Sequence, residues 1–201
     1  TAHCPNPGAM TGLAEPGMTI GLLPAANPKA KLPFRWELTC ADNGWVGINT
    51  GRPNRLAEEA IGAGVIAEVQ GYTHLRREVK YGTGSRVDLL LEAPERPSCF
   101  VEVKNVHLMR TPGLAEFPDS VTARGAKHLS ELSAMVQDGM RAVMLFVVQR
   151  QDCEAMSLAR DIDPNYASAM AEASASGVEV ICYSCTVSEK AITVTQPLAI
   201  V

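Results

Sequence analysis

The pattern of apolar positions predicts an α/β arrangement from about Pro53 onward. The apolar run Ala142–Val148 is continuous, as expected for a central strand that is buried on both faces. The neighbouring segments alternate between strand-like runs and apolar residues at helical spacing. The resulting order is helix, three strands, helix, strand, helix, strand, strand. This order implies a mixed sheet with helices on its faces.

Capping residues and turn residues set the expected bounds of these elements. The expected strands are His74–Lys80, Arg86–Leu91, Phe100–Val106, Ala142–Val148, Val178–Tyr183 and Ala191–Val194. The expected first and last residues are Asn54 and Gly62 or Gly64 for the first helix, Asp119 or Ser120 and Gly139 for the second, and Asp163-Pro164 and Gly177 for the third. The apolar face of the second helix comprises Val121, Leu129, Leu132, Met135 and Val136. Met109–Pro118 is expected to be a long loop, and Pro94 and Pro97 a turn.

Residues 1–52 have a different pattern, with many Gly and Pro residues between short apolar pieces. These pieces are Met18–Leu23, Trp36–Thr39 and Trp45–Ile48, and Asp42-Asn43-Gly44 is a good turn between two of them. Short strands separated by turns predict a small β-barrel. We therefore expect a β-barrel domain over residues 1–52 and an α/β domain over residues 53–201.

One acidic residue interrupts an apolar strand in a way that points to chemistry. Asp88 lies within Val87–Leu91, where an unpaired buried carboxylate is costly and needs a partner or a metal. Glu102 and Lys104 are two positions apart on the next strand, so their side chains project from the same face. A hairpin would place the two strands side by side. The three side chains are therefore expected to converge.

Two carboxylates and a lysine match the needs of phosphodiester hydrolysis. Mg²⁺ (or Mn²⁺) prefers oxygen ligands, here Asp88, Glu102 and the Val103 carbonyl. The metal activates a water, and Lys104 orients it or offsets charge on the phosphate. A third acid from the first helix is expected, and Glu59 is preferred over Glu58 because Glu59 shares a face with Leu56. The alternative is a surface Glu102–Lys104 ion pair of little energetic value.

Composition limits the kind of nucleic-acid contact. The 201 residues carry a net charge of −4, so binding must rely on local basic clusters rather than on overall charge. The clusters are Lys29, Lys31 and Arg35; Arg76, Arg77 and Lys80; and Arg124 with Lys127. Arg124 and Lys127 follow the site and could hold backbone phosphates. Aromatic residues make up only 5%, which argues against extensive base stacking.

The sequence predicts a cytoplasmic protein whose cysteines are reduced. No apolar run approaches the roughly 18 residues of a membrane-spanning helix, and no signal peptide is visible. Because the chain begins at Thr1, a leading segment is expected to precede it. The six cysteines are scattered and mostly in apolar contexts, which is typical of reduced, buried thiols. Cys182 and Cys185 lie in a strand without a second pair, so zinc is not expected.

Several motifs together resemble the sugar fermentation stimulation protein A family. They are Gly84–Asp88, Val101–Val106, Phe117–Leu129, His3–Met10, Pro53–Leu56 and Asp161–Pro164. The match spans essentially the whole chain. The resemblance implies an N-terminal OB-type barrel and a C-terminal PD-(D/E)xK nuclease-like core, with the nuclease motif on Asp88, Glu102 and Lys104 and the helix acid on Glu59.

The resemblance also implies DNA binding and a role in regulating sugar metabolism, notably of maltose. The family pattern has Thr and Ser where this chain has Pro7 and Ala9, which removes hydroxyl contacts from that loop. Family members begin with further barrel strands before His3–Met10, so the barrel here is expected to be N-terminally incomplete. The exposed strand edges of such a barrel would favour a homodimer.

Three functions remain open from the sequence. One is a metal-dependent nuclease acting on DNA, as the intact Asp88, Glu102 and Lys104 indicate. Another is a DNA-binding regulator that keeps the metal site without cleaving. The third is an RNA-processing or repair nuclease, since no residue identifies a reader of the 2′-hydroxyl group.

Overall fold

A computed structural model describes residues 1–42, 44–82 and 84–201 of the chain. It contains helices α1 (Pro53–Gly62), α2 (Ala123–Gln137) and α3 (Pro164–Ala175), and the short 3₁₀ helix Ala67–Val69. Its strands are β1 (Ala2–His3), β2 (Ile20–Pro24), β3 (Phe34–Ala41), β4 (Gly44–Gly47), β5 (His74–Tyr81), β6 (Ser85–Ala93), β7 (Arg96–Val106), β8 (Leu108–Thr111), β9 (Leu114–Phe117), β10 (Arg141–Val148), β11 (Ala155–Leu158), β12 (Glu179–Val187), β13 (Ile192–Pro197) and β14 (Ala199–Ile200).

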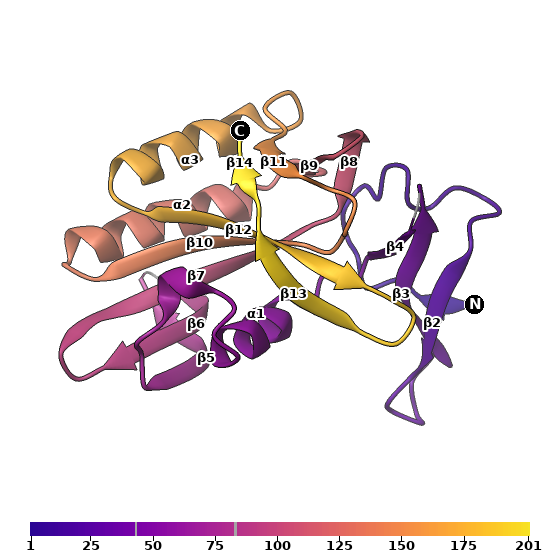
Figure 1. The fold of residues 1–201 in the computed structure, drawn as a ribbon, viewed down its shortest axis with the longest axis horizontal. Coiled ribbons are helices and arrows are strands. Elements are labelled where there is room, and N and C mark those ends of the chain that lie inside the picture. The colour runs from indigo at the N-terminus through magenta and orange to yellow at the C-terminus, as the bar shows by residue number, and fades with distance from the viewer. Residues whose placement is uncertain (43, 83) are drawn as a thin grey trace.

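The N-terminal strands form their own small sheet at one end of the molecule (Figure 1). β3 lies between β1 and β2 and also pairs with β4, and the contacts with β2 and β4 are antiparallel. Five buried apolar side chains fill the space beside this sheet, namely Met10, Leu13, Ala41, Val46 and Ile48. The three predicted strand segments are thus present. Of the predicted turn after Ala41, Asn43 lies outside the described residues.

A six-stranded mixed sheet forms the centre of the larger part, in the order β13-β12-β10-β7-β6-β5. β10 is parallel to both β7 and β12, whereas the remaining neighbours are antiparallel. From Ala142 to Val148 every residue of β10 is buried, which confirms the prediction of a central strand covered on both faces. The mixed α/β architecture inferred from the apolar pattern is therefore correct.

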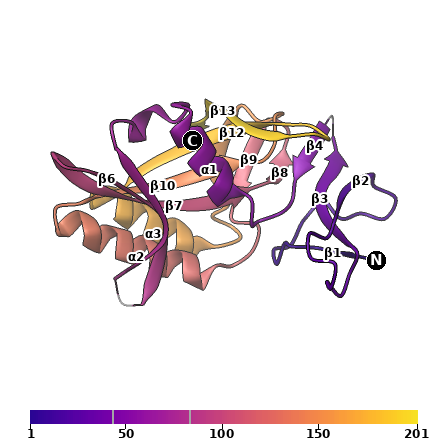
Figure 2. The same ribbon diagram turned by 90° about the horizontal axis from the view of Figure 1, so that it is seen from below.

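The helices cover opposite faces of this sheet, as Figures 1 and 2 show from two directions. α1 packs Leu56, Ala57 and Ile61 into the core on one face. α2 and α3 pack on the other face, where Leu129 and Leu132 of α2 are fully buried. The helix N-cap predicted at Asp163 is confirmed, because its side chain accepts the Tyr166 N–H at 2.9 Å.

Two predicted helix starts are wrong. α1 has Arg52 at its N-cap position and Pro53 in its first turn, and the Asn54 side chain turns elsewhere. α2 is capped by Thr122, whose hydroxyl accepts the Gly125 N–H at 3.1 Å. The Asp119 carboxylate instead accepts the Met10 N–H and lies beside His107. Val121, expected on the apolar face of α2, precedes the helix and is 72% exposed.

The segment Met109–Pro118, expected to be a loop, forms most of a β-hairpin. β8 and β9 pair antiparallel through a turn at Pro112-Gly113, and β9 also pairs with β11. β14 completes this four-stranded sheet, in the order β14-β11-β9-β8. The strands are only two to four residues long, too short to give a periodic signal in the sequence.

Polar contacts join the N-terminal sheet to the central one. The Gly47 N–H donates to the Gln149 carbonyl at 2.9 Å, and the Gln149 side chain donates to Asn105, which follows Lys104 on β7. Arg150 is buried and contacts both Asp42 of the N-terminal part and Asp152. The two parts are therefore joined by directional contacts close to the end of β7.

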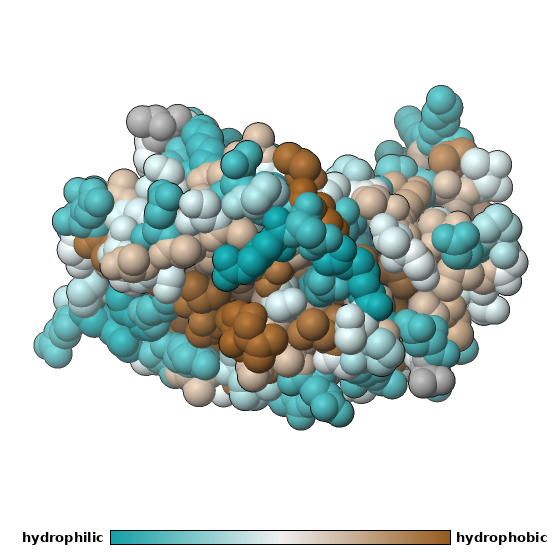
Figure 3. Space-filling view, turned by 90° about the horizontal axis from the view of Figure 1, so that it is seen from above, coloured by the Kyte–Doolittle hydropathy of each residue, from teal (hydrophilic) through white to brown (hydrophobic). Residues whose placement is uncertain are grey.

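The surface carries both apolar and hydrophilic residues, and most of the cysteines are buried free thiols. Apolar residues reach the surface in the middle of the face that Figure 3 shows, bordered by hydrophilic residues. Cys99, Cys153, Cys182 and Cys185 are buried free thiols, as predicted, whereas Cys40 is exposed. None of the helices in the described ranges has the length and apolar composition that a membrane span requires.

Candidate metal centre

Strands β6 and β7 are neighbours, so the chain brings Asp88 beside the strand that carries Glu102 and Lys104. Val101 and Val103 on β7 pack into the core on the α1 face of the sheet. Because side chains alternate along a strand, Glu102 and Lys104 point to the opposite face, toward α2. The predicted convergence of the two strands is thus present in the fold.

The Asp88 carboxylate is held at the point where the β6–β7 ladder ends. The pairing of β6 with β7 ends at Leu89 and Val101, and the Asp88 Oδ2 atom accepts the Val103 N–H at 2.8 Å. Its Oδ1 atom accepts from Asn54 Nδ2 at 2.7 Å. Asn54, predicted as a helix cap, therefore connects the first turn of α1 to the acid. Neither contact is an ion pair, so Asp88 can still bind a cation.

Burial raises the pKa of the Asp88 carboxyl to about 6, and the nearby charge of Glu102 adds to the effect. The Val103 N–H, Lys104 and Asn54 act in the opposite direction but do not offset it. In the metal-free protein, the Asp88 carboxyl therefore stays protonated to a higher pH than usual. A bound cation would favour its ionised form.

This raised pKa predicts a pH-dependent metal affinity. A cation competes with the proton on Asp88, so Mn²⁺ affinity should rise by about tenfold per pH unit below pH 6 and level off above it. The free energy of unfolding of the metal-free protein should instead fall as pH rises. Because the folded pKa lies above the usual aspartate value of 3.8, the stabilising contribution of the protonated acid is full below pH 3.8 and lost as pH rises through about 6. Calorimetric Mn²⁺ titrations at several pH values test the first expectation. Asp88→Asn should bind weakly without the pH slope, and a wild-type affinity that is flat from pH 5 to 7 would contradict the assignment.

Glu102 is the most buried acid of the centre, at 2% exposure. Its Oε1 atom accepts from Lys104 Nζ at 2.7 Å and also contacts His128 Nδ1. Burial alone would raise the pKa of Glu102, but the bonds from His128 and Lys104 bring it below its usual value. Glu102 is therefore an ionised carboxylate in a buried position. The alternative of a surface Glu102–Lys104 ion pair is wrong.

His128 joins the centre from α2 and was not identified from the sequence. Its Nε2 atom accepts from Arg124 Nε at 3.3 Å, so Nδ1 carries the proton and donates to Glu102. One signal was available, because His128 is one turn from both Arg124 and the core residue Leu132. A lone histidine on a helix was not sufficient to assign it.

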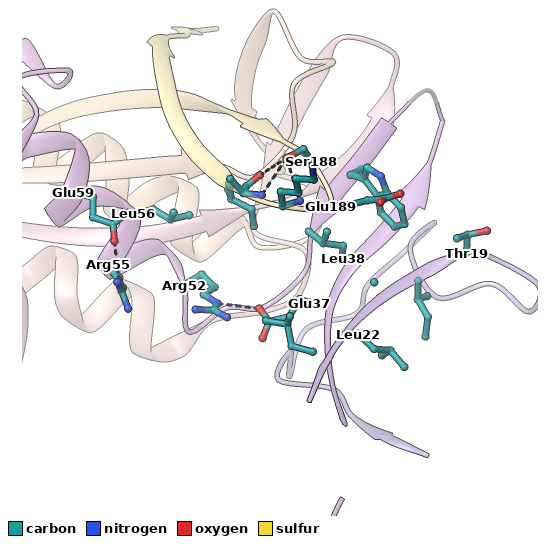
Figure 4. A pocket seen from close by; sticks show the side chains of 17 residues that line it. Thr19, Leu22, Glu37, Leu38, Arg52, Arg55, Leu56, Glu59, Ser188 and Glu189 are labelled. Carbon is teal, nitrogen blue, oxygen red and sulfur yellow. Dashed lines mark hydrogen bonds and ion pairs between the residues drawn. The ribbon is translucent and has the colours of Figure 1, made fainter. Parts of the chain in front are cut away.

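The structure does not bring Glu59 to this centre. Its side chain is 57% exposed, pairs with Arg55 at 2.8 Å and faces a cavity between α1, the β12–β13 turn and the N-terminal sheet (Figure 4). Successive helical residues turn by about 100°, which places Glu59 about 140° around the axis from Asn54 and Glu58 only about 40° away. Glu58 pairs with Arg77 of β5 at 3.4 Å. The helix acid on the side of Asp88 is therefore Glu58.

The donor set still fits a divalent ion. Within the described residues, no group of three or more His, Cys, Asp or Glu side chains is arranged as a metal cluster. However, the Oε2 atom of Glu102 is buried and has no hydrogen-bond partner among the residues that the structure describes. Such an atom is costly unless a ligand satisfies it. Mg²⁺ is commonly held by one or two carboxylates, with water and substrate oxygens completing its shell, so Asp88 and Glu102 suffice.

The predicted basic residues lie in different surroundings. Arg124 and Lys127 lie on α2 beside His128 and line a shared cavity with it. Arg76 is paired with Glu92 at 2.8 Å, and Arg35 is paired with Glu37. Lys29, Lys31 and Lys80 are exposed. Arg124 and Lys127 are thus the predicted cations that the structure places next to the carboxylates.

Comparison with known proteins identifies the family. Residues 51–191 match the family model described as the sugar fermentation stimulation protein RE domain, where RE denotes restriction endonuclease, and residues 1–48 match the SfsA N-terminal OB domain. The sugar fermentation stimulation protein homologues of Maricaulis maris and Paramagnetospirillum magneticum are both 55% identical, over 100% and 98% of this chain and 85% and 84% of their own lengths. The structure of Pyrococcus furiosus SfsA in complex with Ca²⁺ superposes with a TM-score of 0.90 at 25% identity, over 100% of this chain and 85% of that one. This chain therefore belongs to the sugar fermentation stimulation protein family, with an N-terminal OB domain and a restriction-endonuclease-like α/β domain.

Proposed function

We propose that this protein is a metal-dependent nuclease that acts on DNA, with Asp88 and Glu102 as metal ligands and Lys104 as the catalytic lysine. The observation that carries the proposal is the state of Glu102. It is buried and ionised, and its Oε2 atom lacks a hydrogen-bond partner within the described chain. Lys104 lies beside it, as does the carboxyl of Asp88, whose pKa is raised rather than lowered. This combination is costly for stability alone and is typical of a catalytic site.

Each side chain has a distinct role in the proposed reaction. A divalent ion, when bound, would polarise the phosphate and acidify a water. Glu102 holds Lys104 through the 2.7 Å contact, which fixes the ammonium group where charge develops on the phosphate. Asn54 and the Val103 N–H hold Asp88 in place. His128 keeps one oxygen of Glu102 occupied and leaves the other free for the cation.

Mg²⁺ or Mn²⁺ is the proposed metal. Support for a divalent ion comes from the Pyrococcus furiosus relative, whose structure was solved in complex with Ca²⁺. Ca²⁺ takes six to eight oxygen ligands, whereas Mg²⁺ binds through one or two carboxylates plus substrate oxygens. Two carboxylates match the second pattern better.

A second candidate function is DNA binding without cleavage, in the regulation of sugar metabolism such as that of maltose. The position of Glu59 favours it, because no third acid joins the two carboxylates within the described residues. In that case the centre would be a retained metal site. Processing or repair of RNA by the same residues is a third use of the site.

Cleavage of labelled single- and double-stranded DNA and RNA, with Mg²⁺, Mn²⁺ or EDTA, separates these functions. The proposal predicts metal-dependent cleavage of DNA that exceeds cleavage of RNA and is lost in Asp88→Asn. Tight DNA binding without cleavage under any metal condition would favour the regulatory function. Preferential cleavage of RNA would favour the third.

Reversing charge on α2 is expected to weaken binding for all DNA sequences alike. Arg124→Glu with Lys127→Glu removes two phosphate contacts, so the slope of log affinity against log salt should become shallower by about 2. Fluorescence anisotropy at several salt concentrations measures this slope. Arg160→Glu, at an exposed arginine elsewhere, is the matched control. An unchanged slope in the double variant would remove these residues from the interface.

A further inference from the structure

A cavity of about 470 Å³ adjoins the metal centre on the α2 face of the sheet. Two elements line it. Glu78, Gly84, Ser85 and Arg86 come from the β5–β6 hairpin, and Arg124, Lys127 and His128 come from α2. Arg86 thus lines the same cavity as the two cations of α2, from a separate part of the chain. Sequence distance hides this grouping, because Arg86 and Arg124 are far apart along the chain.

The lining carries an excess of positive charge. Arg86, Arg124 and Lys127 are cationic, whereas Glu78 is the acidic residue of the lining. Lys127 also forms an ion pair with Glu131, at 3.6 Å between Nζ and Oε1. Arg86 has no ion-pair partner among the described residues. The chain as a whole has a net charge of −4, so the charge of this cavity has the opposite sign to that of the whole molecule. Its ligand is expected to be an anion.

His128 connects this cavity to the metal centre. It lines the cavity, accepts from Arg124 and contacts Glu102. An anion in the cavity is therefore separated from the carboxylates by a single side chain. That arrangement suits a polymer with regularly spaced phosphates, since one phosphate can occupy the cavity while another lies at the metal.

We propose that this cavity is a phosphate subsite that holds a phosphate group next to the cleaved linkage, with Arg86 as its third cation. The inference rests on the proposed function, which supplies the nucleic acid, and deepens it by naming where the substrate is held. Guanidinium groups match phosphate in geometry and can donate two parallel hydrogen bonds. The held group is an internal phosphodiester or a terminal phosphate, which have the same recognition chemistry.

Neutralising phosphates one at a time tests the subsite. A short labelled DNA is made with a single uncharged methylphosphonate at each position, and binding is measured in Mg²⁺ with Lys104→Gln to prevent cleavage. We expect one position at which the change weakens binding about fivefold to tenfold. In Lys104→Gln with Arg86→Gln, the same change should cost less than about twofold, whereas Arg160→Gln as the partner change should leave the pattern intact.

Substrate ends distinguish the two sources of phosphate. If the sensitive group is terminal, removal of the 5′-phosphate reproduces the loss; if it is internal, a closed circular strand binds as well as a linear one. Either result supports the subsite. A uniform response at all positions, or a sensitive position that is unchanged by Arg86→Gln, overturns it and leaves the nuclease proposal intact. Failure of every DNA to bind overturns both.

Discussion

Lys104→Gln is expected to reduce metal-dependent cleavage about 10²–10³-fold and to change DNA affinity by less than about threefold. The reason is that Lys104 acts on charge that develops during the reaction, and such charge contributes mainly to turnover. Glutamine keeps most of the side-chain length and can still contact Glu102, so the fold should persist. His128 continues to hold Glu102 in the variant.

Single-turnover cleavage and equilibrium binding measure the two quantities separately. Lys190→Gln, at an exposed lysine of the β12–β13 turn, is the matched control and should retain wild-type turnover. Retention of more than about a tenth of the wild-type rate in Lys104→Gln would assign the chemistry to another group. A parallel loss of binding and turnover would make Lys104 a binding residue instead.

Arg150→Ala is expected to lower the free energy of unfolding by about 3–5 kcal/mol, the range for removal of one partner from a buried ion pair. The Arg150 side chain is 2% exposed and donates to Asp42, Asp152 and the His107 carbonyl. Its loss leaves Asp152 and that carbonyl without their donor and opens a void between the two domains. Arg150→Lys should recover little, because an ammonium group cannot reproduce the contacts of a guanidinium.

Urea denaturation gives the free energies for this comparison. Asp42→Asn tests the exposed end of the same network, since the Asp42 side chain is 53% exposed and its ion pair is worth less than about 1 kcal/mol. Near-equal destabilisation by Arg150→Ala and Asp42→Asn would show that burial of Arg150 contributes little. A change below about 1 kcal/mol in Arg150→Ala would contradict the account of the interface.

Signals confined to short stretches of sequence predicted the main elements well. The β10 strand followed from an uninterrupted apolar run, and α3 followed from Asp163-Pro164. Asp88, Glu102 and Lys104 were found because charged side chains interrupt apolar strands, and an antiparallel pairing of adjacent strands made them neighbours. In each case the deciding contacts lie within one element or between consecutive ones.

Predictions failed where a distant residue decided the outcome. Asp119 looks like a helix cap, but contacts with Met10 and His107 draw its carboxylate away and leave the cap to Thr122. Asn54 likewise turns to Asp88. The β8–β9 hairpin is stabilised by pairing with β11, which lies much later in the chain. No local pattern carries such information.

The choice between Glu58 and Glu59 shows how a small angular error changes which helix acid is the candidate site residue. Glu59 was preferred because it shares a helical face with Leu56, and Leu56 is indeed buried. The buried face of α1, however, is not the side that meets Asp88. The position of Asn54 defines that side, and this contact appears only in the folded structure.

The centre and its surroundings form a connected set of contacts. Arg124 contacts His128, His128 and Lys104 hold Glu102, and Glu102 lies close enough to influence the ionisation of Asp88. A divalent ion bound by the two carboxylates would satisfy the free oxygen of Glu102 and favour the ionised form of Asp88. Metal binding is therefore the claim on which the proposed chemistry depends.

Anomalous diffraction from crystals soaked in Mn²⁺ tests that claim most directly. We expect one strong peak between the carboxylates of Asp88 and Glu102, with Glu59 making no contact to it, and loss of the peak in Asp88→Asn. A Mn²⁺ peak at another set of residues, or none at this centre at a saturating Mn²⁺ concentration, would contradict it.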